Sequence, residues 1–165
     1  MNTNITKSFI LYFITIIFTS IHLITFDFLV NTNLSLPLFE LMIIYYFTIY
    51  KHNTFGLLFI ALIGLWSDAL SGSPLGFSSI IYISIIKIYH IVNHKFVAKE
   101  NFIEIIIEFT IFITSIIFLK WLFLSIYYNN THNFMPFMMK IIISSISYIV
   151  IHNILNFLTN KLETD

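Results

Sequence analysis

Asp68 is the residue in this sequence with the clearest potential for chemistry, because it ends an apolar run that also holds glycine. Residues 56–76 contain all four glycines of the chain. A carboxylate in the middle of a membrane costs about 2.5–3.5 kcal/mol on insertion scales, so such a residue usually has a partner or a role. Two interpretations are open: a proton or ion site, or a structural acid held by the amides of the following turn and by the hydroxyls of Ser71 or Ser73.

Lysines and other titratable residues offer further candidate pairs. Lys120 and Lys140 are possible partners for Asp68, since both fall in the same half of the predicted membrane domain. Two pairs at helical i, i+4 spacing are candidate metal ligands, and they are His90 with His94 and Glu104 with Glu108. Metal-binding bundles of this kind use Glu-x-x-His combinations, which the sequence lacks. We therefore predict no metal site, and expect Glu100, Glu104 and Glu108 to neutralise Lys95 and Lys99.

Catalytic motifs are absent from the sequence. There is no cysteine, no serine in a nucleophile elbow, no His-Glu-x-x-His and no phosphate-binding loop. His22 and His152 are isolated polar residues on apolar segments, which favours packing or interhelical hydrogen bonds. The same interpretation applies to a group of hydroxyl residues, namely Thr110, Thr114, Ser144, Ser145 and Ser147. We expect no enzymatic activity and no cofactor.

The composition indicates an integral membrane protein. Of the 165 residues, 58% are hydrophobic and 10% are charged, and the mean hydropathy is +0.91. A soluble domain of this size could not bury so much apolar surface. The eight basic and eight acidic residues balance, and no basic cluster occurs, which argues against a nucleic-acid partner.

The apolar runs predict one all-α membrane domain over residues 1–165. Six transmembrane helices are expected, at about 8–30, 36–50, 55–70, 74–92, 102–126 and 135–158. Five lysines fall in the two tails and in the loops after the second and fourth helices, and they are Lys7, Lys51, Lys95, Lys99 and Lys161. By the positive-inside rule, both termini are predicted to be cytoplasmic. Asp68 then lies toward the outer leaflet, while Lys87, Lys120 and Lys140 are expected to snorkel toward the membrane surfaces.

The third and fourth predicted helices should form a tight hairpin. Ala61, Gly64 and Asp68 lie on one face of the third helix, and a stripe of small residues in a membrane usually marks a helix-packing surface. Three residues of the turn have positional preferences, with Gly72 suited to the helix C-cap, Ser73 to the next N-cap and Pro74 to the first helical position. The Asp68 carboxylate is thus predicted to lie near a helix N-terminus, whose partial positive charge stabilises anions.

Residues 64–76, Gly-Leu-Trp-Ser-Asp-Ala-Leu-Ser-Gly-Ser-Pro-Leu-Gly, closely resemble the signature of the bacterial rod shape-determining protein MreD family. In that family a helix with a G-x-x-x-D pattern runs into a Gly-Ser-Pro-x-Gly turn. The matching positions are Gly64, Asp68, Gly72, Ser73, Pro74 and Gly76. The chain length, the Pro-led second and sixth helices and the basic loop after the fourth helix agree in outline.

The resemblance implies a non-enzymatic component of the cell-elongation machinery in the bacterial inner membrane. Its implied partners are membrane lipid, an MreC-like single-span protein, a RodA-like glycosyltransferase, a class B transpeptidase and the actin-like MreB filament. From the residues we add the hypothesis that the small-residue seam presents a fixed surface to other transmembrane helices. The alternative is a substrate-binding subunit of an energy-coupling-factor vitamin transporter, although the first helix lacks the alanines or glycines of the usual docking surface.

Overall fold

The computed structural model describes residues 12–13, 15–17, 19–20, 37–50, 56–93, 101–128 and 135–164, and every regular element within them is helical. The elements are α2 (Phe39–Tyr45), the π-helical turn η2 (Tyr46–Tyr50), α3 (Leu57–Ser71), α4 (Phe77–Asn93), α5 (Phe102–Tyr127) and α6 (Met135–Thr164). The all-α prediction is confirmed for this part of the chain. Most of the predicted helix at 8–30 lies outside the described residues, although those described between Tyr12 and Ser20 are helical.

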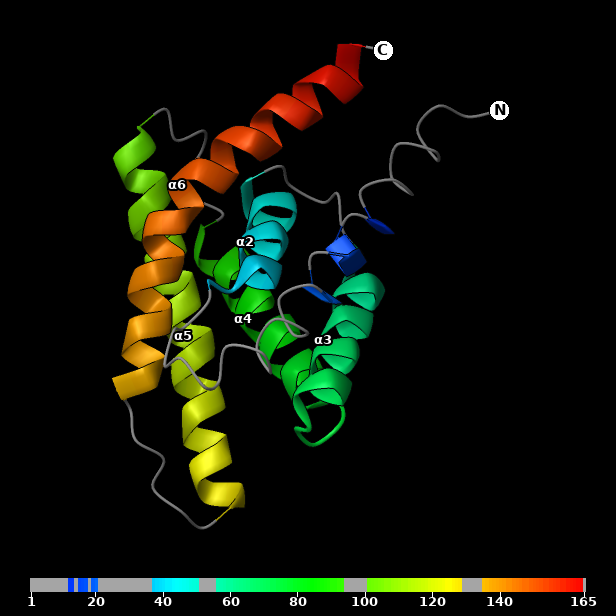
Figure 1. Ribbon diagram of the computed structural model, residues 1–165, viewed down its shortest axis with the longest axis vertical. Coiled ribbons are helices and arrows are strands. Elements are labelled where there is room, and N and C mark those ends of the chain that lie inside the picture. The colour runs from blue at the N-terminus through cyan, green and yellow to red at the C-terminus, as the bar shows by residue number, and fades with distance from the viewer. Residues whose placement is uncertain are drawn as a thin grey trace.

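Two helices are long and apolar enough to cross a membrane, at Phe102–Tyr127 and Met135–Lys161. They run antiparallel and in contact along one side of the molecule (Figure 1). Three shorter apolar helical stretches, Phe39–Ile49, Leu57–Ser71 and Phe77–Ile91, make up most of the rest. At 1.5 Å per residue, a 15-residue helix such as α3 spans only about 23 Å, less than the hydrocarbon core of a typical bilayer.

Helix α2 lies between the α3–α4 hairpin and the α5–α6 pair (Figure 1). Every residue from Leu41 to Phe47 is at most 2% exposed. A helix that is apolar on all sides suits such a central position. The start of α2 is held by α6, because the Leu38 N–H donates a 2.9 Å hydrogen bond to Ser144 Oγ. This contact agrees with the interhelical role predicted for Ser144.

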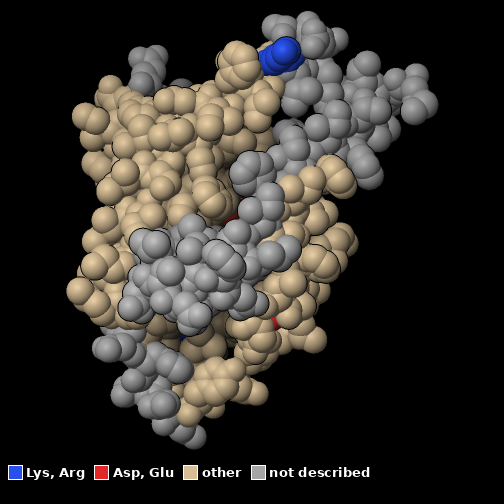
Figure 2. Space-filling model, viewed as in Figure 1, with Lys and Arg blue, Asp and Glu red and all other residues tan. Residues whose placement is uncertain are grey.

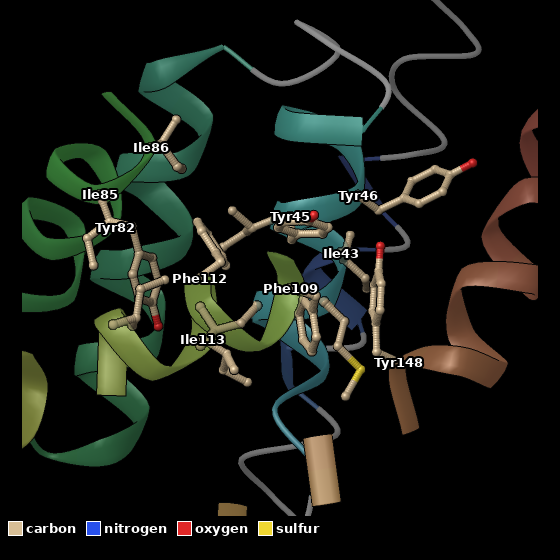
Figure 3. Close-up of a cluster of buried hydrophobic side chains, with 14 of the residues drawn as sticks. Ile43, Tyr45, Tyr46, Tyr82, Ile85, Ile86, Phe109, Phe112, Ile113 and Tyr148 are labelled. Atoms are coloured by element: carbon tan, nitrogen blue, oxygen red, sulfur yellow. The ribbon is translucent and has the colours of Figure 1, made fainter. Parts of the chain in front are cut away.

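The core combines aromatic rings with branched aliphatic side chains (Figure 3). Phe109 of α5 stacks on Tyr148 of α6, with ring centroids 4.0 Å apart. Tyr45 of α2 packs edge-on against both rings, at 5.3 Å and 5.5 Å. Because aromatic pairs at these distances add to the energy of area burial, this cluster joins α2 to the α5–α6 pair.

The face of the molecule in Figure 2 shows few charged side chains among the described residues, and many large apolar side chains of the described helices are exposed. On α3, the exposed face carries Leu58, Leu62, Leu65 and Trp66, while Ile60, Ile63, Gly64, Ser67 and Asp68 are buried. Large apolar side chains are exposed on one face of α3, while its polar Ser67 and charged Asp68 are buried on the other, which is not the pattern of a water-soluble helix. This arrangement agrees with the membrane class that the composition predicts.

Candidate functional site

The α3–α4 contact is closest at Gly64. A Cβ atom added there would lie 2.5 Å from Ser79 N and 2.6 Å from Ser79 Cα, so only glycine fits. Ser79 Oγ donates a 2.7 Å hydrogen bond to the carbonyl oxygen of Ala61, one turn earlier on α3. The small-residue stripe is therefore covered by α4 of the same chain. This is the tight packing of the two hairpin helices that the sequence predicts.

The Asp68 side chain is fully buried and binds the first turn of α4. The Ser78 N–H donates to both carboxylate oxygens, at 2.9 Å to Oδ2 and 3.2 Å to Oδ1. This places the carboxylate at the N-terminus of α4, where the sequence predicted it, and it caps that helix from the neighbouring one. Hydroxyls of Ser71 or Ser73 were expected on the carboxylate, but Ser71 Oγ donates to the Asp68 main-chain oxygen at 3.4 Å and pairs with Ser73 Oγ at 3.0 Å.

The turn between α3 and α4 follows the prediction at its start and departs from it at its end. Gly72 ends α3 in the left-handed conformation at φ +67°, as its C-cap position predicts. Ser73 and Pro74 do not begin the next helix, and α4 starts at Phe77. The reason is Gly76, whose φ of +87° is incompatible with helix and adds a second turn, in which the Phe77 N–H donates to the Pro74 oxygen.

A second buried acid, Glu40 of α2, lies at the centre of a hydrogen-bonded cluster that our sequence analysis missed. Its side chain is 3% exposed. Glu40 Oε1 accepts hydrogen bonds from Tyr82 Oη of α4 at 2.8 Å and from Ser67 Oγ of α3 at 3.3 Å. Lys120 Nζ of α5 in turn donates to Tyr82 Oη at 2.9 Å. We call Glu40, Ser67, Tyr82 and Lys120 the Glu40 cluster; it joins four helices.

Lys120 does not snorkel toward the outer end of α5, and it does not bond Asp68. Its ammonium group lies 4.8 Å from the centroid of the Tyr82 ring and bonds the hydroxyl of the same residue. The side chain turns inward because Glu40 provides the opposite charge behind Tyr82. Lys140 of α6 is close enough to Lys120 and Glu40 to interact electrostatically with both. Lys120, which we expected as a partner of Asp68, is thus linked to Glu40 through the Tyr82 hydroxyl.

One sequence signal would have found Glu40. The insertion cost that drew attention to Asp68 applies equally to a glutamate within the apolar run Leu-Phe-Glu-Leu-Met-Ile-Ile. A lone lysine at 120, inside the apolar run of the fifth helix, carries the same signal with the opposite sign. Two opposite charges within the apolar segments of a small helical domain are expected to lie close together.

The other predicted polar residues have structural partners. Glu104 is exposed and accepts a hydrogen bond from Asn101 Nδ2 at 3.0 Å, while Glu108 Oε2 accepts one from Tyr45 Oη at 3.4 Å. Within the described residues, no group of three or more His, Cys, Asp or Glu is arranged to hold a metal ion. Four residues of the charged loop lie outside the described part of the chain, and they are His94, Lys95, Lys99 and Glu100.

His152 lies in a chain of hydrogen bonds at the far end of α6. Its Nδ1 pairs with Tyr148 Oη and its Nε2 with Asn156 Nδ2, both at 3.1 Å. Asn156 Oδ1 accepts a hydrogen bond from Tyr46 Oη of η2. His152 therefore reaches the neighbouring helical turn through Asn156, in line with the structural role predicted for it. His22 falls outside the described residues.

Three of the predicted hydroxyl residues of α5 and α6, Thr110, Thr114 and Ser145, donate hydrogen bonds to backbone carbonyls. Thr110 Oγ1 donates to the Ile106 oxygen at 2.8 Å and lies 3.2 Å from Ser145 Oγ across the helix pair. Thr114 Oγ1 donates to the Thr110 oxygen at 2.6 Å. Back-bonding of this kind satisfies the hydroxyl inside an apolar environment. These contacts are those expected of packing residues.

Over 121 residues the chain is 29% identical to an uncharacterized protein of Rickettsia prowazekii (strain Madrid E), an alignment that covers 73% of this chain and 68% of the relative. No protein-family model matches the chain, and no solved structure matches it.

Proposed function

We propose that this chain is a non-enzymatic inner-membrane component of the bacterial cell-elongation machinery, a docking protein similar to the MreD family. The observation that carries the proposal is the α3–α4 hairpin, where the residues of the resemblance form one unit. Gly64 allows the two helices into backbone contact at Ser79, Asp68 caps α4, and Gly72 closes the turn. A hairpin held by close backbone contacts at its turn and in the first turn of α4 has little freedom to deform there, which suits a fixed docking element.

The proposed topology has six spans with both termini in the cytoplasm. Two helices of sufficient length and apolarity support the membrane assignment. The distribution of lysines between the loops supports the orientation. Helices α3 and α4 have 15 and 17 residues, fewer than the 20 or so of a usual transmembrane helix. Their lengths fit a locally thin bilayer or helices that are only partly immersed in it.

The proposed docking surface is the outward face of α3. Leu58, Leu62 and Leu65 are 76%, 53% and 40% exposed there, on the side opposite Gly64 and Asp68. The buried stripe keeps α3 rigid, and the exposed face is available to a span of another protein. By the resemblance, the partners are an MreC-like single-span protein, a RodA-like glycosyltransferase and a class B transpeptidase, with the MreB filament on the cytoplasmic side.

Co-purification from native membranes tests the proposal. Affinity-tagged wild-type protein should recover the elongation partners. Asp68→Asn, which weakens the cap on α4, should recover about tenfold less, the equivalent of 1.4 kcal/mol in binding. The matched control is Glu104→Gln, which neutralises an exposed carboxylate and should recover the wild-type amount. Recovery of none of these partners by the wild-type protein would overturn the proposal.

The transporter alternative makes opposite predictions. Native mass spectrometry of a vitamin-transporter subunit would detect a bound vitamin-like molecule, whereas we expect none. Reconstituted alone in liposomes, the protein should conduct neither solute nor protons. A flux that disappears in Asp68→Asn would contradict the docking role and favour transport.

A further inference from the structure

Glu40 has one carboxylate oxygen, Oε2, that lacks a hydrogen-bond donor in the described part of the chain. Glu40 Oε2 is buried, and no described residue donates a hydrogen bond to it, whereas Oε1 receives two. A carboxylate accepts through both oxygens, and an acceptor left without a donor inside an apolar environment is costly. The site therefore calls for a group that donates a hydrogen bond to Oε2.

Lys120 has the complementary need. An ammonium group carries three N–H donors, and one of them is used on Tyr82 Oη. Within the described residues, no other hydrogen bond of Lys120 Nζ is formed. The two hydrogen bonds at Tyr82 Oη, 2.8 Å and 2.9 Å long, keep Nζ no more than about 6 Å from Glu40 Oε1, and so no more than about 8 Å from Oε2 on the same carboxylate. Water spans a separation of this size with hydrogen bonds of ordinary length, as one molecule up to about 6 Å and as two beyond it.

The charges around the site select the ligand. A metal cation needs several oxygen ligands and would be repelled by Lys120 and by Lys140. An anion would be repelled by Glu40 and by Asp68, since both carboxylates are close enough to Lys120 to interact with it electrostatically. A neutral molecule that accepts a hydrogen bond from an ammonium and donates one to a carboxylate is repelled by neither the lysines nor the carboxylates. Water is the smallest such molecule and commonly makes about three hydrogen bonds inside proteins.

We propose that the Glu40 cluster is a binding site for water, held between Glu40 Oε2 on α2 and Lys120 Nζ on α5. The water completes a closed set of hydrogen bonds with Tyr82, so that a bound solvent molecule, rather than a direct ion pair, links α2 to α5. This inference does not depend on the proposed docking function.

Magnetisation transfer from water in solid-state NMR tests this site in lipid bilayers. The protein is labelled with ¹³C in the side-chain carboxyl groups of Glu and Asp, and transfer from water protons to Glu40 Cδ is compared with transfer to Asp68 Cγ. Both acids are almost fully buried, but Asp68 is bonded to a backbone amide. We expect early transfer to Glu40 and none to Asp68 on that time scale. Absence of transfer to Glu40 would overturn the proposal.

A substitution makes the assignment specific. Lys120→Met removes the donor side of the water site and should abolish transfer to Glu40 Cδ. Lys87→Met, at an exposed position on α4, should leave the transfer intact. Persistence of the Glu40 transfer in Lys120→Met would contradict the bridge to α5. Should Lys120→Met fail to fold, the comparison of the two acids in the wild-type protein still decides the proposal.

Discussion

Two acids are buried among the residues that the structure describes, and their surroundings differ. Asp68 lies at the α3–α4 hairpin with both oxygens bonded to one backbone amide, that of Ser78. Glu40 lies where α2 meets α3, α4 and α5, and the donors to its Oε1 are the side-chain hydroxyls of Tyr82 and Ser67. A backbone donor is fixed once the helices pack, whereas side-chain donors have rotamers and can be replaced. The hairpin acid is therefore held by a fixed backbone donor, whereas the Glu40 cluster has unused hydrogen-bonding capacity.

The largest effect on stability is expected from a substitution in the Glu40 cluster. Lys120→Met leaves a buried carboxylate without its counter-charge and should lower the free energy of unfolding by about 3–5 kcal/mol. Unfolding in detergent micelles, followed by circular dichroism, measures the change. Adding Glu40→Gln to Lys120→Met should restore most of the loss, because the buried carboxylate that lacked the Lys120 counter-charge is then removed. A double variant as unstable as the single one would show that the two charges are not coupled.

Gly64→Ala tests the hairpin side. The new methyl group would meet backbone atoms of Ser79, which cannot rotate away, so we expect a loss of about 3 kcal/mol, at the upper end for overpacking. Gly56→Ala is the matched control. Gly56 has no atom within 4 Å of its Cβ position, and the change at this N-cap should cost less than about 1 kcal/mol. Equal effects of the two substitutions in the same unfolding assay would mean that the close approach is unimportant.

Asp68→Asn is expected to have a smaller effect than Gly64→Ala. It keeps one oxygen for the Ser78 amide but removes the charge at the N-terminus of α4, at a cost of about 2 kcal/mol. Amide hydrogen exchange should locate the change. Compared with the wild-type protein, exchange should be faster at the Ser78 amide and unchanged along α5. Uniform acceleration in both helices would instead indicate global destabilisation and would argue against a local cap.

Gly72→Ala, in the turn of the hairpin, is expected to have the smallest effect on the free energy of unfolding. The left-handed conformation at φ +67° penalises any residue with a Cβ, and no neighbouring atom adds a steric clash. We expect a loss of about 1 kcal/mol in the free energy of unfolding. Gly72→Asn should lose less, because asparagine adopts this conformation more readily. A larger loss for asparagine than for alanine would contradict the conformational explanation.

Local features of the hairpin could be predicted from sequence, because their signals lie close together in the chain. Gly72 ends α3 next to the residues it caps, and Asp68 lies ten residues before the amide it binds. The start of α4 could not be predicted from Ser73 and Pro74 alone. The left-handed Gly76 overrides their N-terminal preferences, and nothing in one sequence distinguishes that glycine from one within a helix.

The Glu40 cluster required the packing of distant segments. Glu40 and Tyr82 are 42 residues apart, and Tyr82 and Lys120 are 38 apart. The insertion cost of a charge identifies Glu40 and Lys120 as unusual, but it does not say which partner each one has.

Site-specific cross-linking from α3 tests the docking role most directly. A photo-reactive amino acid is placed at Leu62, on the exposed face opposite Gly64, and separately at Ile146, exposed on α6. After irradiation of native membranes, the Leu62 position should give covalent adducts with an elongation partner identified by mass spectrometry, and the Ile146 position should not. Adducts at Ile146 with none at Leu62 would contradict the assignment of the α3 face as the docking surface.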